Sequence, residues 1–142
     1  MRCIFLILFI STLNSFIYSQ NNWNTQYFRC FGNNISIPLP PDFNTPKYFE
    51  YEEGSITNYS TTDTCVVSIL CGELGELELD SSYHVTKTQT IVNGIKRIDY
   101  YSKSLNRYAR KDYLSEYLIM YDRATIARKE ELDRLFDFLE AK

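Results

Sequence analysis

The chain has 142 residues, of which 44% are hydrophobic, 15% aromatic and 23% charged, and its formal net charge is −3. This length suits one compact domain rather than two. A mildly acidic chain lacks the basic surface that nucleic-acid phosphates require, so we exclude nucleic acid as a partner.

Residues 1–19 have the pattern of a secretory signal peptide: Arg2 gives the positive end and Ile4–Ile10 is an unbroken apolar run. The run is short for a membrane span, and a short membrane anchor is the alternative reading. We therefore predict a secreted or periplasmic protein that meets a membrane only if the leader is retained. Residues 20–26 are polar and predict a flexible end, and one domain then spans residues 27–142.

The first predicted strand contains Ile35, Ile37 and Leu39, which alternate with Asn34, Ser36 and Pro38. Proline cannot donate to a strand ladder, so this strand is predicted at an edge. Because an exposed edge can accept a strand from another chain, we take this segment as the candidate for strand addition.

Aromatic residues near position 50 and the segment 55–59 predict two extended pieces, joined by a turn at Glu53-Gly54. Cys65–Cys71 is the predicted central strand, because it is apolar on both faces and so needs cover on both. Residues 72–80 alternate leucine with acidic residues and predict a solvated acidic loop or edge strand. A cation site is the alternative there, but the spacing matches no calcium loop, so we predict no metal.

Residues 86–102 predict a hairpin with a two-residue turn at Asn93-Gly94, the strongest short hairpin signal. Val92 should then face Ile95 across the turn. In this register Ile91, Ile98 and Tyr100 share one face of the hairpin. Both sides carry apolar groups, which predicts a hairpin that is largely interior.

Residues 104–111 are polar and basic and predict an exposed connection. Within it we select a patch that could dock an acidic partner, formed by Arg107, Tyr108, Arg110 and Lys111. Tyr113–Tyr121 then predicts one further strand with apolar residues on both faces.

A helix is predicted from Ile126 to Glu140, with Thr125 as its N-cap. Its apolar stripe consists of Leu132, Leu135, Phe136 and Leu139, at the spacing of one helical face. The predicted fold is therefore α+β: a mostly antiparallel sheet of about five to six strands, with the C-terminal helix packed on one face.

Three cysteines remain after the leader is removed: Cys30, Cys65 and Cys71. Cys65 and Cys71 lie on one predicted strand, about 20 Å apart, so they cannot bond to each other. The predicted disulfide joins Cys30 to Cys65 or to Cys71 and leaves one thiol free. Buried free thiols are the alternative.

Four features occur in order along the chain: an Ile-x-Ile-Pro-type opening at Ile35–Pro41, the Asn-Gly hairpin, a tyrosine-containing strand and the closing pattern at Lys129–Leu139. This order resembles that of small exported α/β-sandwich proteins of the PsbP and DcrB kind. The resemblance implies a sheet covered by helix and a binding or assembly role. It supplies no catalytic residue.

The sequence offers no established catalytic motif: it has no glycine-rich phosphate loop, no Gly-x-Ser-x-Gly and no His-Glu-x-x-His. We therefore predict a non-enzymatic binding or assembly module that contacts another protein, with no cofactor and no catalytic residue. The first alternative is a carrier of a small ligand or a metal. The second is a hydrolase using a carboxylate site or a Cys/His pair, for which His84 is the one histidine.

Overall fold

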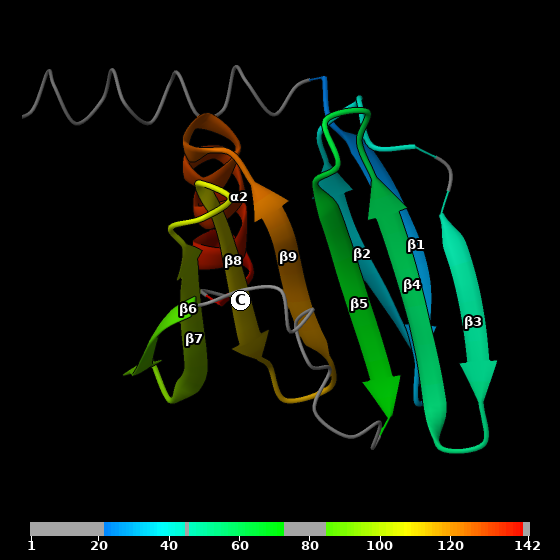
Figure 1. Cartoon of the computed structure of the whole chain (residues 1–142). Coiled ribbons are helices and arrows are strands. Elements are labelled where there is room, and N and C mark those ends of the chain that lie inside the picture. The colour runs from blue at the N-terminus through cyan, green and yellow to red at the C-terminus, as the bar shows by residue number, and fades with distance from the viewer. Residues whose placement is uncertain (1–21, 45, 73–84, 141–142) are drawn as a thin grey trace, which may run out of the picture.

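The computed structural model describes residues 22–44, 46–72 and 85–140. The predicted leader, the acidic stretch after Gly72 and His84 lie outside these residues. The described part contains a seven-stranded antiparallel sheet, a separate two-stranded hairpin and one C-terminal helix, α2 (Figure 1). The predicted class, α+β with a mostly antiparallel sheet, is confirmed, but the predicted five to six strands were too few.

The large sheet has the order β3-β4-β5-β9-β8-β7-β6. From one edge to the other its strands are β3 (Lys47–Tyr51), β4 (Gly54–Ser60), β5 (Val66–Gly72), β9 (Leu118–Ala124), β8 (Arg107–Tyr113), β7 (Ile95–Ser102) and β6 (Val85–Val92). The hairpin consists of β1 (Asn24–Cys30) and β2 (Asn33–Leu39), and α2 spans Ile126–Glu140.

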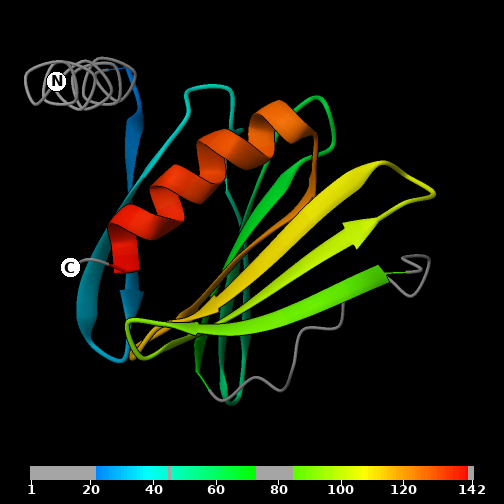
Figure 2. The same cartoon turned by 90° about the vertical axis from the view of Figure 1, so that its left-hand side faces the viewer.

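The hairpin and α2 together form one layer on the same face of the sheet (Figures 1 and 2). β1 and β2 lie over β4 and β5, and α2 lies over β8 and β9. The core between the layers is built from buried apolar side chains of all three parts: Ile37, Leu39, Val67, Ile69, Ile119, Tyr121, Leu132, Leu135, Phe136 and Leu139. The predicted stripe of the helix is thus confirmed as its buried face.

The predicted β6–β7 hairpin is confirmed in both turn and register, but the prediction of a largely interior hairpin was wrong, because β6 is the outermost strand of the sheet and Ile91 is 74% exposed. Asn93 and Gly94 have φ values of 52° and 81°, as a type I′ turn requires, and Val92 pairs with Ile95. β5 is confirmed as an interior strand. Ile69 on one of its faces and Leu70 on the other are 1% and 3% exposed.

The N-cap prediction is also confirmed. The amide of Arg128 donates to Thr125 Oγ1 at 3.3 Å, and the amide of Lys129 donates to the Thr125 carbonyl at 2.8 Å. Among the residues described, none forms a helix with the length and apolar character needed to cross a membrane.

Three boundary predictions were wrong. β1 begins at Asn24, so residues 24–26 belong to a strand and not to a flexible end. Residues 107–111 belong to β8 and not to an exposed connection. Tyr113–Tyr121 is not one strand, because β8 ends at Tyr113 and a turn precedes β9; in that turn the Leu114 amide donates to the Tyr117 carbonyl at 3.0 Å.

Candidate binding edge

The predicted basic patch does not exist as one surface. Arg110 and Lys111 are 1% and 4% exposed, while Arg107 and Tyr108 are half-buried. Successive residues of a strand point to opposite faces, so Arg110 and Lys111 lie on opposite sides of the sheet. Neither of the two buried cations is available to an acidic partner at the surface.

Arg110 instead belongs to a buried ion cluster beneath the last turns of α2. Its guanidinium lies 2.6 Å from Asp112 Oδ2 and 3.0 Å from Glu140 Oε1. Arg97, on the neighbouring strand, reaches Glu140 Oε2 at 2.9 Å and Asp137 Oδ1 at 2.6 Å. Two arginines of the sheet therefore hold the acidic end of the helix. We call these five residues the ion cluster.

Burial and ion pairing shift the pKa values of two carboxyl groups in the ion cluster, those of Asp112 and Glu140. Burial raises the pKa of Asp112 to about 7, against the opposing effect of Arg110, and the neighbouring Glu140 raises it further. The pKa of Glu140 is lowered although burial opposes this, because Asp112 and Arg97 hydrogen-bond to its carboxylate. Of the two neighbouring carboxyl groups, Asp112 therefore takes up a proton at a higher pH than Glu140 does.

A second polar contact holds the middle of the helix. Tyr121 Oη donates to Asp133 Oδ1 at 2.7 Å, and Lys129 pairs with the same carboxylate. Although burial opposes it, these two donors hold the pKa of Asp133 below its usual value. The sheet face under α2 is therefore covered by ion-paired polar groups and by the apolar stripe of the helix.

The cysteines are arranged as one disulfide and one shielded thiol. Cys30 and Cys71 are bonded, with a Cα–Cα distance of 5.3 Å, so of the two predicted pairings Cys71 is the one formed. Cys65 is fully buried, and burial raises the pKa of its thiol to about 12. A thiol in that state is a poor nucleophile near neutral pH.

The disulfide fixes the tip of the β1–β2 hairpin on the sheet. The turn after Cys30 consists of Phe31 and Gly32, with φ values of 48° and 88°. On the other side of the turn, Asn33 Nδ2 donates to Glu116 Oε1 at 3.0 Å. A bulky residue rarely adopts positive φ, yet Phe31 does so with 74% of its side chain exposed.

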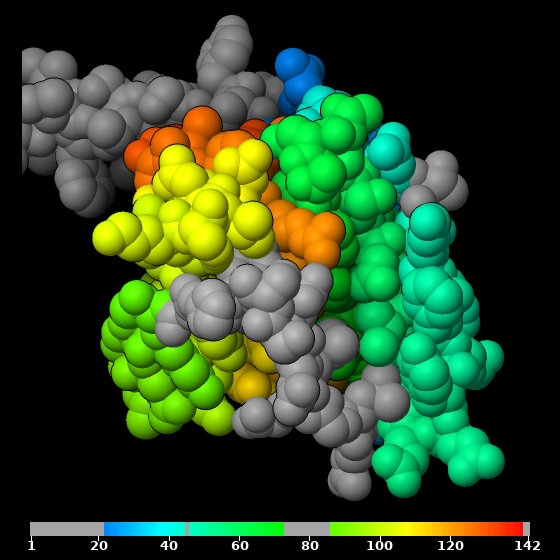
Figure 3. Space-filling model, viewed as in Figure 1, coloured from blue at the N-terminus to red at the C-terminus, as the bar shows by residue number. Residues whose placement is uncertain are grey.

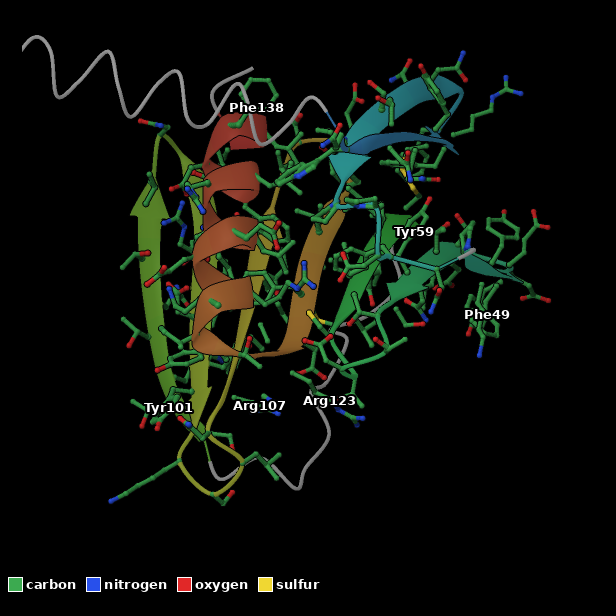
Figure 4. All side chains as sticks on the ribbon, turned by 90° about the horizontal axis from the view of Figure 1, so that it is seen from above. Phe49, Tyr59, Tyr101, Arg107, Arg123 and Phe138 are labelled. Atoms are coloured by element: carbon green, nitrogen blue, oxygen red, sulfur yellow. A yellow bond between two sulfur atoms is a disulfide. The ribbon has the colours of Figure 1, made fainter. Side chains whose placement is uncertain are left out.

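β3 forms the edge of the sheet beside this tip. Among the strands that the structure describes it pairs with β4 alone, and all five of its residues are exposed. Three of them are aromatic: Tyr48, Phe49 and Tyr51 are 59%, 45% and 51% exposed. Figure 3 shows β3 as one margin of the molecule, and Figure 4 shows Phe49 at the opposite end of the sheet from Tyr101.

The register of β3 decides which of its backbone groups are free to pair. Tyr51 pairs with Gly54 around a two-residue turn, and such a closing pair is hydrogen-bonded. Bonded and non-bonded pairs alternate along an antiparallel ladder, so the N–H and C=O groups of Tyr48 and Glu50 point away from β4. These are the groups that an added strand would meet.

A groove of about 480 Å³ lies between the hairpin tip and this edge, and we call it the β3 groove. Its lining consists of Arg29, Phe31, Gly32, Tyr48, Glu50, Tyr51, Glu52, Glu53, Gly54, Ser55 and Cys71. β4 and β5 approach closely at its floor. A Cβ on Gly54 would lie 2.1 Å from the carbonyl oxygen of Cys71, so only glycine fits there.

A second hollow, of about 280 Å³, lies on the other side of Phe31, between the hairpin tip and the turn that joins β8 to β9. Phe31 therefore lines both hollows. Among residues 22–44, 46–72 and 85–140, no three His, Cys, Asp or Glu side chains are grouped as metal ligands.

The segment predicted for strand addition is not the edge of the large sheet. Ile37 and Leu39 are 0% and 1% exposed and face the core, and β2 pairs with β1 in its own two-stranded sheet. The edge with exposed aromatic side chains is β3. Its sequence signal was available, because Tyr48, Phe49 and Tyr51 put aromatic rings on both faces of a short strand that also carries charge.

In comparisons with known proteins, no family model, curated protein or solved structure matches the chain. The resemblance to PsbP and DcrB proteins therefore stays a prediction.

Proposed function

We propose that this protein is an exported, non-enzymatic binding module that takes an extended segment of another protein as an extra strand on β3. The observation that carries the proposal is that β3 has, within the described part of the chain, a partner strand on one side only, is exposed at every residue and borders a groove. In strand addition the main chain supplies affinity, and pockets for alternate side chains supply specificity. β3 and its groove have both parts.

The aromatic side chains support the same reading. Tyrosine and phenylalanine are enriched in the anchor positions of protein interfaces, because each ring covers a large area at low entropic cost. Tyr48 and Phe31 border the β3 groove, and Phe49 extends the apolar surface on the other face of the strand.

Two features support the exported, non-enzymatic part of the proposal. A disulfide persists in oxidising compartments, which agrees with the signal-like pattern of residues 1–19. All three described cysteines are also unsuited to nucleophilic chemistry, because two form the disulfide and Cys65 is buried and protonated.

The test is a selection of displayed random nine-residue peptides against the oxidised protein, followed by measurement of Kd for the recovered sequences. Tyr48→Pro removes an outward N–H from β3, and Gln89→Pro makes the equivalent change on the opposite edge, β6. We expect Tyr48→Pro to weaken binding at least tenfold and Gln89→Pro to leave it unchanged.

Both variants are checked for an intact fold by thermal melting before Kd is compared. Recovery of no binding peptide would contradict the proposal. Equal binding by wild type and Tyr48→Pro would contradict it as well, since the edge would then be unnecessary.

A further inference from the structure

We infer that the segment bound on β3 is basic, with a lysine or arginine opposite Glu50 and an apolar residue opposite Phe49. This inference rests on the proposed function and names the chemistry of the partner. It starts from the charge of the β3 groove, whose lining includes three glutamates, Glu50, Glu52 and Glu53, and one arginine, Arg29.

The three glutamates are exposed, and none has an ion-pair partner among the residues described. They differ in this from Asp112 and Glu140, which are held by arginines within the fold. A cation that enters the groove would therefore meet carboxylates that are not already neutralised. The charge of the whole chain, −3, also favours encounter with a basic segment.

The register of β3 on β4 determines where the lysine or arginine of the bound segment would lie. Glu50 and Tyr48 pair with Ser55 and Thr57, which belong to the face of β4 that looks toward the hairpin. A residue opposite Glu50 on an added strand shares this face and points into the groove. Its ammonium or guanidinium would reach the glutamates, while its methylene stem would cover the rings of Tyr48 and Phe31.

The other face of β3 sets two further preferences. Phe49 is exposed there, and an aromatic or β-branched residue opposite it gives a favourable cross-strand pair. Lys47 lies on the same face, so a basic residue opposite Lys47 is disfavoured. A matching segment therefore carries its positive charge near the Glu52–Glu53 turn and a neutral or acidic residue at the other end.

The test uses a short peptide, Ser-Thr-Arg-Val-Thr-Glu-Ser, which in antiparallel register puts arginine opposite Glu50 and valine opposite Phe49. It is titrated into the ¹⁵N-labelled, oxidised protein, and Kd is read from the amide shifts of β3. We expect saturable shifts in β3. We also expect at least fivefold weaker binding when the arginine is replaced by glutamate, and several-fold weaker binding when sodium chloride rises from about 50 to about 500 mM.

Exchanging the charge at position 50 distinguishes a specific pair between Glu50 and the peptide arginine from general attraction between an acidic protein and a basic peptide. Glu50→Lys should bind the arginine peptide at least tenfold more weakly than the wild type does, and it should bind the glutamate peptide more tightly. Glu130→Lys makes the same change of net charge on exposed helix surface and should alter neither.

Equal affinity for the arginine and glutamate peptides would overturn the inference and leave the proposed function standing. Failure of both peptides to shift β3, together with an empty display selection, would overturn both. Shifts of β3 that depend on protein concentration alone would also overturn the inference, because a second copy of the chain would then occupy the edge.

Discussion

The two halves of the sheet are covered in different ways. Over β4 and β5 lies a hairpin joined to the sheet by the Cys30–Cys71 disulfide, and the half ends in the aromatic edge β3. Over β8 and β9 lies α2, held by its apolar stripe and by the ion cluster, and that half ends in the polar edge β6. The helix leaves its half closed, whereas the hairpin leaves a groove. The half covered by the hairpin therefore carries both the groove and the aromatic edge β3, which is the surface proposed above for a partner.

The largest expected effect comes from removing the disulfide. It closes a separation of 41 residues, for which the chain-entropy argument gives about 4 kcal/mol of stability. We expect the Cys30→Ser/Cys71→Ser variant to lose about that much in urea unfolding, and to lose hydrogen-exchange protection in β3, β4 and β5 before β8 and β9. Cys65→Ala keeps the disulfide and is the control. Equal loss of protection in both halves would break the comparison.

The next effect concerns the half under the helix. Leu135 is fully buried in the stripe, and its replacement by alanine should cost about 3 kcal/mol by lost contact and cavity formation. Exchange protection should then fall first in β8 and β9. Ile126→Ala, at a position 56% exposed on the same helix, should change the free energy of unfolding by less than about 0.5 kcal/mol.

A smaller effect is the pH dependence of the ion cluster. The folded protein raises the pKa of Asp112 to about 7, and burial also raises the pKa of Asp99. A group whose pKa is raised by folding adds stability while it is protonated, and that stability is lost as pH rises toward the folded pKa. We expect the melting temperature to fall between about pH 5.5 and 8, and Asp112→Asn to reduce that fall by at least half.

Glu116→Gln, at the exposed turn before β9, is the matched control and should keep the slope of the wild type. A melting temperature that rises over this range would show that Asp112 is charged without penalty. Below about pH 4 the sign reverses, because the folded state lowers the pKa of Asp133 and Glu140.

The smallest effects on stability are expected at the edges themselves. Phe49→Lys on β3 and Ile91→Lys on β6 both replace an exposed apolar residue, 45% and 74% exposed, on an outermost strand. Each should change the free energy of unfolding by less than about 0.5 kcal/mol. Phe49→Lys should nevertheless weaken binding of the arginine peptide, measured from its Kd, because the peptide loses its cross-strand partner at Phe49, whereas Ile91→Lys should leave the Kd unchanged. Weaker binding by Ile91→Lys than by Phe49→Lys would assign the binding edge to β6.

Local patterns explain what the sequence predicted well. The Asn93-Gly94 turn fixes its own register, and the stripe from Leu132 to Leu139 fixes which face of α2 is buried. Both depend on residues close together in the chain. The end of β8 was missed because Leu114 and Tyr117, in the following turn, are apolar and pack against the core, so the alternation continued across it.

The burial of Arg110 was missed for a different reason. A charged residue is expected at the surface unless it is paired. Asp112, two residues along the same strand, is one partner of Arg110, but the other three, Asp133, Asp137 and Glu140, follow more than twenty residues later. Their spacing puts the three acids on one face of α2, beside the apolar stripe. That second stripe was the available signal. For β3 the aromatic residues on both faces were a local signal of an edge, but its place in the strand order could not be predicted, because strand order is set by the whole sheet.

The shielded Cys65 has a consequence for oxidative maturation. Loops closed from Cys30 to Cys65 or to Cys71 differ by six residues in about forty, so chain entropy alone hardly distinguishes the two pairings in the unfolded chain. Burial of Cys65 at the start of β5 withdraws it from thiol exchange and leaves Cys71 to react. Correct oxidation of this protein therefore follows collapse of the sheet, and a chain oxidised before collapse would contain mispaired species that need an isomerase or a reductant to recover.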